Sequence, residues 1–344
     1  MRRGLIARSP DELPDAALDA RLARVRAAMT VASLDALIVY TNNTRPAGVS
    51  WLTGFVPYWS EALLVLPRDG DPVLVVALTF RVKTWIERTS RVADVIHTPR
   101  IGLEAGRRIA AAKADAAVGI VDFDNLSAGI VDDLRAGGPR LALRDASRLF
   151  AQARAVADPA EIGLAKKAGA IAREALARVT PDGSSLGEML AAAEAAARQQ
   201  GAEEIYLAVA PDLARDSRLR RVEGDVTPGA IFAVRASVAY KGSWVRMTRT
   251  IGCEKAEAAA ATFAGAVRGL PSGRDFAGFG AWLVEGCRLA QPLEALMGSR
   301  VAPAQPPALG MIVSVQAQLD VGTPVLIGAP ALVGQGLLAE PILG

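Results

Sequence analysis

The sequence predicts an α/β N-terminal domain over residues 1–155 and an α+β C-terminal domain over residues 156–344. Three observations support this fold class. The chain has 344 residues and is 51% hydrophobic, which is enough to bury two separate cores. Short apolar runs alternate with helical patterns in the first half, as in layered α/β domains. The second half begins with two long helical patterns, and strand patterns follow them.

The elements of the N-terminal half follow from hydrophobic periodicity and turn residues. Leu18, Leu22, Val25 and Met29 form one stripe at helical spacing, and Gly137-Gly138 is a typical helix end. Arg68-Asp69-Gly70-Asp71 is a turn signal between two apolar runs. The predicted helices are Asp11–Ala32, Phe80–Thr89, Gly102–Ala114 and Asn125–Ala136, and the predicted strands are Leu34–Tyr40, Ala62–Pro67, Pro72–Leu78, Ala93–Ile96, Ala117–Val121 and Leu141–Leu143.

The C-terminal half begins after a boundary near Arg154–Asp158. Helical patterns cover Glu161–Val179 and Leu186–Gln199, separated by a Pro-Asp-Gly turn at 181–183. Tyr240-Lys241-Gly242 is a turn signal between two short apolar runs, which predicts a β-hairpin. The predicted strands are Ile205–Val209, Val234–Val238, Val245–Ile251 and Met311–Leu319.

The predicted hairpin brings two arginines together. A turn centred between Tyr240 and Lys241 places Arg235 directly opposite Arg246, with their Cβ atoms about 5 Å apart. Two permanent charges at ~4 Å repel by roughly 4 kcal/mol at an effective dielectric near 20, so we expect an anion or an internal carboxylate between them. Arg218 is a further candidate for this anion pocket. The internal carboxylates considered are Glu203, Glu204, Asp225 and Asp320.

The hairpin also carries a family resemblance. Ile231–Ile251 reads IFAVRASVAYKGSWVRMTRTI and resembles the central hairpin of creatinase, prolidase, aminopeptidase P and methionine aminopeptidase, the pita-bread hydrolases. The matching residues are Tyr240, Gly242, Thr248, Arg249 and Thr250. The resemblance implies a pita-bread C-terminal domain, in which Arg249 is structural. Val49–Phe55, VSWLTGF, likewise resembles the N-terminal domain of creatinase and prolidase.

The residues at the family's metal-ligand positions cannot bind metal in the same way. The two aspartate positions fall on Arg235 and Arg246, and guanidinium groups have no lone pair to offer. The first glutamate position falls on Gln316 and the second lies near Gly328. A family histidine maps loosely to Arg218, and the chain's single histidine lies in the other half. Hard divalent cations need several oxygen or imidazole ligands in one place, so we expect no metal and no other cofactor.

The composition argues against a nucleic-acid-binding, membrane-spanning or secreted protein. The net charge of +3 is modest and no basic stripe is evident, so we expect no nucleic-acid partner. No run approaches the ~18 apolar residues of a membrane span, and the N-terminus turns charged too soon for a signal peptide. The two cysteines, Cys253 and Cys287, suggest a reducing compartment, so we expect a cytoplasmic protein. The excess of arginine over lysine and the many alanines suggest a bacterial gene.

Two functions remain open at this point. The first is a non-catalytic homologue that serves as a binding, scaffold or partner subunit, as a homodimer or with an active homologue, as the resemblance implies. The second is a metal-independent enzyme for a small anionic substrate, with arginines stabilising charge. We favour the first because no histidine is available as a base: His97 is expected to be structural, and the cysteines lack an activating partner. The acid or base of the second would come from Glu203, Glu204, Tyr206 or Asp320.

Overall fold

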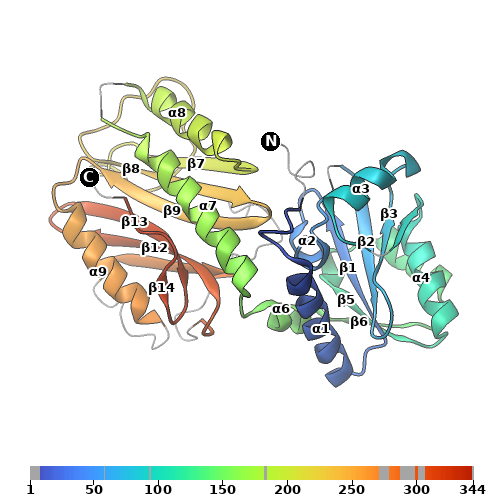
Figure 1. Ribbon diagram of the computed structural model, residues 1–344. Coiled ribbons are helices and arrows are strands. Elements are labelled where there is room, and N and C mark those ends of the chain that lie inside the picture. The colour runs from blue at the N-terminus through green and yellow to red at the C-terminus, as the bar shows by residue number, and fades with distance from the viewer. Residues whose placement is uncertain are drawn as a thin grey trace. The chain divides into compact units, whose positions relative to one another are not determined.

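The computed structural model describes residues 8–57, 59–92, 94–181, 184–270, 279–286, 299–300 and 307–342. The chain divides into two compact units, Arg2–Ala155 and Val156–Gly344, each with its own sheet (Figure 1). None of the described helices is both long enough and apolar enough to cross a membrane.

The N-terminal unit is built on a six-stranded mixed sheet in the order β4-β3-β2-β1-β5-β6. β1 pairs antiparallel with β2 and parallel with β5, so Ile38 lies between Val65 and Ile120. β2–β3 is an antiparallel hairpin. The edge strand β4 pairs in parallel with β3, and the other edge strand β6 pairs in parallel with β5. The strands are β1 (Ala36–Asn42), β2 (Glu61–Pro67), β3 (Val73–Val76), β4 (Asp94–His97), β5 (Ala117–Val121) and β6 (Ala142–Asp145).

Helices cover both faces of this sheet. Alternate residues of β1 point to opposite faces, so Val39 packs with Met29 and Phe150, whereas Ile38 packs with Ile109. One apolar cluster therefore joins the sheet to α1, α2 and α6, and another joins it to α4 and α5. The helices are α1 (Asp15–Val31), α2 (Ala47–Thr53), α3 (Lys83–Thr89), α4 (Ile101–Ala112), α5 (Ala128–Gly137) and α6 (Ser147–Arg154), with short 3-10 turns η2 (Phe80–Val82) and η3 (Phe123–Asn125).

The C-terminal unit is built on an eight-stranded antiparallel sheet in the order β11-β10-β12-β13-β9-β8-β7, with β14 paired to β13. β8–β9 and β12–β13 are each paired along their whole length. The strands are β7 (Glu204–Ala210), β8 (Phe232–Tyr240), β9 (Ser243–Ile251), β10 (Ala281–Gly286), β11 (Ser299–Arg300), β12 (Ile312–Asp320), β13 (Pro324–Leu332) and β14 (Gly336–Leu337).

Two helices with capping boxes cover one face of this sheet. In α7 (Pro159–Ala177), the Asp158 carboxylate accepts from the Glu161 N–H at 2.9 Å, while the Glu161 carboxylate accepts from the Asp158 N–H. Ser185 and Glu188 repeat this arrangement at the start of α8 (Leu186–Gln199). α7 and α8 pack on β7–β9 in one core, and α9 (Ala256–Arg268) packs on β12 and β13 in another (Figure 1). The opposite face of β7–β9 carries the polar residues considered below.

Candidate functional site: the polar face of the C-terminal sheet

The β8–β9 turn has a different centre from the predicted one. Tyr240 pairs with Ser243, so Lys241 and Gly242 form a two-residue turn with φ values of 45° and 78°. Positive φ at both positions is the requirement of a type I′ hairpin turn, and it explains the glycine. The Gly242 N–H donates to Glu203 Oε1 at 2.7 Å, and Glu203 is only 2% exposed. This buried carboxylate therefore holds the turn.

The shifted turn corrects the predicted arrangement of the two arginines. Arg246 lies opposite Ser237, and Arg235 lies opposite Thr248, so the expected direct opposition of Arg235 and Arg246 is wrong. Residues 235 and 237 share a face because side chains alternate along a strand. The two arginines are thus diagonal neighbours on one face, a relation that typically separates residues by about 7–8 Å. The sequence placed both on the same face but overestimated their proximity.

Arg246 finds its counter-charge inside the protein. Its Nη1 lies 2.6 Å from Glu285 Oε2, and the two side chains are 4% and 1% exposed. The Arg246 Nε also donates to Ser237 Oγ at 3.2 Å. A short, buried, charge-assisted bond of this kind is among the stronger polar interactions in proteins. An internal carboxylate was one of the two expected partners of Arg246, but Glu285 was not among the carboxylates considered.

The pairing of β10 with β12 places Glu285 beside Arg246. Glu285 lies opposite Ser314, and the Ser314 Oγ donates to the backbone oxygen of Arg246 at 3.0 Å. β12 therefore touches β9 through a side chain, although β13 stands between them in the strand order. The signal that would have identified Glu285 is a lone acidic residue in the apolar run AWLVEG, a pattern that indicates a buried carboxylate needing a partner.

Gln316 and Gly328 fit each other across β12 and β13. They are paired in the register, and a Cβ built on Gly328 would lie 2.2 Å from Gln316 Oε1. The Gln316 amide donates to Ser314 Oγ and Val315 O, each at 3.0 Å, and it accepts from Thr248 Oγ1. The two positions expected to carry glutamates thus hold a neutral amide and a residue whose missing side chain leaves room for it.

The remaining predicted site residues lie elsewhere or farther out. Arg218 is in the segment between β7 and β8, where its side chain is 87% exposed and its Nε donates to Asp216 Oδ1 at 3.0 Å. The hydrogen bond with Asp216 raises the pKa of Arg218. Arg235 is half-buried on β8, next to Ala208 of β7. The structure therefore brings Arg235, Arg246 and Gln316 to one face and leaves Arg218 in solvent.

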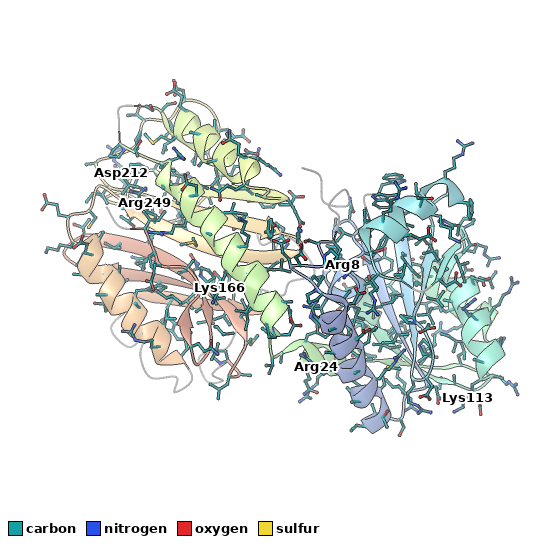
Figure 2. All side chains as sticks on the ribbon, viewed as in Figure 1. Arg8, Arg24, Lys113, Lys166, Asp212 and Arg249 are labelled. Carbon is teal, nitrogen blue, oxygen red and sulfur yellow. The ribbon has the colours of Figure 1, made fainter. Side chains whose placement is uncertain are left out.

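The end of the hairpin that carries Arg249 and Thr250 has a structural role. Arg249 points to the helix-covered side, where its Nη1 donates to Leu176 O at 2.8 Å and Val179 O at 3.0 Å, at the end of α7 (Figure 2). Burial lowers the pKa of Arg249. Thr250 Oγ1 donates to Leu326 O at 2.8 Å and accepts from the Leu326 N–H at 2.9 Å. Both residues thus join β9 to neighbouring elements.

Three of the four proposed acid–base residues, Glu203, Tyr206 and Asp320, are engaged in structural contacts, and so is the single histidine. Tyr206 stacks on Trp244 with ring centroids 5.8 Å apart. Asp320 ends β12 and accepts from the Gly322 N–H at 2.9 Å. His97 donates from Nδ1 to Leu78 O at 3.0 Å. Cys253 is buried, and Cys287 lies outside the described residues.

These contacts do not fit a divalent cation. Across the described part of the chain, no group of three or more His, Cys, Asp or Glu side chains lies together. At the polar face, the carboxylate of Glu285 is bonded to Arg246, and the Gln316 amide fills the space above Gly328. Such cations require several oxygen or imidazole ligands around one point, and a guanidinium group offers none. The polar face is therefore built for side-chain pairing.

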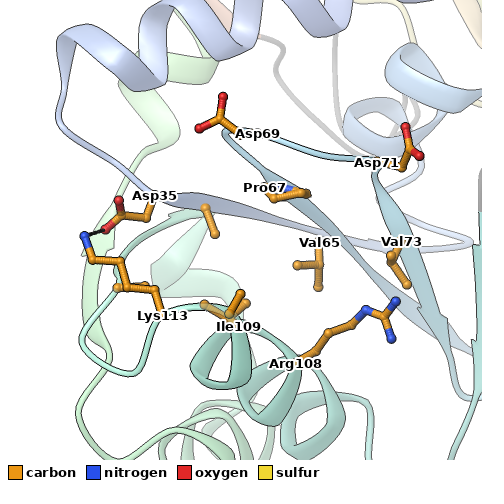
Figure 3. Close-up of a pocket in the computed structure, with 12 residues that line it drawn as sticks. Asp35, Val65, Pro67, Asp69, Asp71, Val73, Arg108, Ile109 and Lys113 are labelled. Carbon is orange, nitrogen blue, oxygen red and sulfur yellow. Dashed lines mark hydrogen bonds and ion pairs between the residues drawn. The ribbon is translucent and has the colours of Figure 1, made fainter.

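The N-terminal unit has a pocket of its own, of about 230 Å³. Val65, Val73 and Ile109 form apolar walls between the β2–β3 hairpin and α4, while Asp35 and Lys113 lie at one end (Figure 3). Lys113 Nζ donates to Asp35 Oδ2 at 2.9 Å, and this bond is the main reason that the pKa of Asp35 is lowered. The two charges neutralise each other, so this end of the pocket offers no free acid or base.

Comparisons with known proteins agree with this architecture. The Creatinase/Prolidase N-terminal domain family matches residues 21–156. The prolidase from Pyrococcus horikoshii OT3 matches with a TM-score of 0.70 at 16% identity, covering 94% of this chain and 99% of that one. The Xaa-Pro dipeptidase from Bacillus anthracis gives 0.70 at 17% identity, with coverages of 95% and 99%. The X-Pro aminopeptidase from Thermotoga maritima MSB8 gives 0.71 at 14% identity, with coverages of 94% and 99%.

No curated protein sequence matches this chain. At these identities the structural matches establish the fold, and they extend over both units and nearly the whole length of each relative. Residues 21–156 therefore match the Creatinase/Prolidase N-terminal domain, and the chain as a whole has the pita-bread fold seen in the prolidases and Xaa-Pro peptidases of known structure.

Proposed function

We propose that this protein is a non-catalytic pita-bread homologue that acts as a binding, scaffold or partner subunit. The observation that carries the proposal is the buried bond between Arg246 and Glu285. It occupies the face where the resemblance places metal-binding aspartates, and it leaves the Glu285 carboxylate committed to a guanidinium. A carboxylate held in this way is a poor general base because protonating it would strand the charge of Arg246.

Several observations support a retained structural role. Prolidase and Xaa-Pro peptidase structures match 94–95% of this chain, which supports a protein that has this fold at full extent. The hairpin residues Arg249 and Thr250 make contacts that join β9 to α7 and β13. We infer a dimer, homomeric in isolation or heteromeric with an active homologue, in which this chain supplies surface. Stable interfaces of that kind commonly bury at least ~1,200 Å².

The alternative of a metal-independent enzyme for anionic substrates receives no comparable support. It requires arginine charge available to a ligand, whereas Arg246 is paired with an internal carboxylate. Two of its four candidate acid–base residues, Glu203 and Asp320, accept hydrogen bonds from backbone N–H groups at a turn and a strand end. We therefore expect sulfate or citrate to shift the melting temperature of the wild type by no more than they shift that of Arg246→Met. The shift in the variant measures the general effect of salt.

The proposal is tested by paired measurements of activity and assembly. The purified chain is incubated with Mn²⁺ or Co²⁺ and a panel of Xaa-Pro dipeptides, beside a prolidase assayed in the same buffers. We expect no hydrolysis above that of a heat-inactivated sample. The tagged chain is also isolated from its native source and its mass measured by light scattering. Metal-dependent turnover, or a monomer both alone and from the native source, would contradict the proposal.

A further inference from the structure

We infer that the Arg246–Glu285 pair and the Gln316–Gly328 contact together form a metal-free cross-link across the weakest seam of the C-terminal sheet. This cross-link makes the residues at the four positions interdependent. The inference concerns how the fold is held and does not rest on the proposed function. It follows from three features of the structure: the pairing of the strands, the burial of the charges and the space above Gly328.

The first feature is an interruption in backbone pairing. β8–β9 and β12–β13 are each paired along their length, but β13 pairs with β9 only at Gly328 and Thr248 in the described strands. The two hairpins therefore meet at a seam with little backbone hydrogen bonding. Side chains must hold this seam, and the polar residues of the sheet gather there. Thr248 bonds to Gln316, and Thr250 bonds to the backbone of Leu326.

The second feature is a buried ion pair that spans the same seam. Arg246 belongs to β9 and Glu285 to β10, and in the strand order β12 and β13 lie between Glu285 and the seam. Ser314 of β12 donates to the Arg246 backbone oxygen, so the contact extends over three strands. Because both charges are almost fully buried, removing either one leaves the other without its counter-ion in a medium of low dielectric. The ion pair therefore stabilises the sheet only when both residues are present.

The third feature is the exclusion of a carboxylate at position 328. A Cβ there would lie 2.2 Å from the Gln316 amide, which would have to move. Movement would break its bonds to Thr248 and Ser314. Gly328 is thus needed for as long as Gln316 holds its present position. A carboxylate introduced at position 328 alone would displace the Gln316 amide and disrupt the cross-link, and it would not by itself create a metal site.

Two double-mutant cycles in the full-length protein test this inference by thermal unfolding. Arg246→Met or Glu285→Gln should each lower the melting temperature by about 10 °C, since each leaves a buried polar partner unmatched. The double variant should fall by less than the sum of the two. Arg218→Met, the same replacement at an exposed ion pair, is the matched control and should shift the melting temperature by no more than about 2 °C.

The second cycle uses Gly328→Ala and Gln316→Ala. Gly328→Ala should lower the melting temperature by about 3–6 °C in the wild-type background and by less than about 1 °C in the Gln316→Ala background. It provides the test even if variants of the buried ion pair fail to fold. Additive shifts in this cycle, or in a foldable ion-pair cycle, would overturn the inference. Each scan is repeated with EDTA and with Mn²⁺, and a Mn²⁺-dependent rise in the wild type would also overturn it.

The cross-link and the proposed non-catalytic function can be refuted independently of each other. Additive cycles would reject the cross-link and leave the proposed non-catalytic function untouched. Peptidase turnover by the wild type would reject that function and leave the coupling between these positions to be judged by the cycles alone.

Discussion

Two arginines three residues apart on β9 face opposite sides of the C-terminal sheet. Arg249 points toward α7 and donates to the carbonyl groups of Leu176 and Val179. Arg246 points to the polar face and binds the carboxylate of Glu285. The comparison shows that one hairpin carries two separable sets of residues. Arg249 and Thr250 join β9 to α7 and β13, whereas Arg246 and Gln316 hold the polar face through side-chain pairing.

The two arginines also differ in how their charge is balanced. The end of a helix carries about half a negative charge on its free carbonyl groups, which suits a cation there. Even so, burial lowers the pKa of Arg249. Arg246 has a full opposite charge at 2.6 Å. We therefore expect the polar face to respond more sharply to the loss of one partner than the helix-covered face does.

The largest effect is expected from Glu285→Ala. It leaves the guanidinium of Arg246 buried without its carboxylate, which typically costs about 3–5 kcal/mol. Urea unfolding of the full chain, followed by hydrogen exchange of β9, measures the loss. Glu223→Ala serves as a control because Glu223 is 83% exposed, and we expect a change within about 0.5 kcal/mol. Equal, small losses for the two variants would mean that Arg246 does not depend on Glu285.

Arg249→Met should have the next largest effect. It removes two charge-assisted bonds to carbonyl oxygens at the end of α7, for a loss of about 2–3 kcal/mol. Hydrogen exchange should rise in the last turn of α7 and remain unchanged at the start of that helix. Arg178→Met, at an exposed pair with Glu174, is the matched control and should leave exchange near its wild-type level. Uniform exchange along α7 would contradict a local role for Arg249.

A smaller effect is expected from Thr250→Val. This replacement keeps the shape of the side chain but removes the hydroxyl that bonds twice to the backbone of Leu326. A loss of about 1–2 kcal/mol follows from leaving these backbone groups unmatched. Thr262→Val on the exposed side of α9 is the control, because it removes only a bond within its own helix. The comparison would be weakened if the two variants unfolded at the same urea concentration.

The smallest effect is expected at the exposed Lys113–Asp35 pair of the N-terminal unit, which contrasts with the buried Arg246–Glu285 pair. The hydrogen bond from Lys113 lowers the pKa of Asp35 below its ordinary value of 3.8, so the contribution of Asp35 to stability is present above that value. It is lost as the pH falls through the lower folded-state pKa. Hydrogen exchange of β1 should therefore differ between wild type and Asp35→Asn at neutral pH and converge as the pH falls through the lowered pKa of Asp35. A constant difference over this range would contradict the assigned cause.

Much of the architecture could be predicted because it depends on local patterns. β5 has the predicted bounds Ala117–Val121, and α8 has the predicted bounds Leu186–Gln199. Other elements were missed. α9 was not predicted, although it is rich in alanine, the strongest helix former, and has an apolar face that packs on β12 and β13. α1 begins at Asp15 rather than Asp11, since Pro14 is extended.

The need for a counter-charge beside Arg246 could be predicted from its residue type, but the position of that charge could not. The register failed by one position at the turn because Lys241 adopts a positive φ, which sequence patterns do not favour for lysine. Glu285 was missed because its pairing with Arg246 joins residues 39 apart in the chain through a strand that was not predicted.

The central claim is that side-chain pairing holds the polar face in place of a metal. Elemental analysis of the purified, extensively dialysed protein tests it most directly, with Glu285→Ala and Gln316→Ala variants prepared in parallel. We predict no stoichiometric Mn, Co, Zn or Fe in any of the three samples. A stoichiometric ion in the wild type that is lost in either variant would contradict the claim.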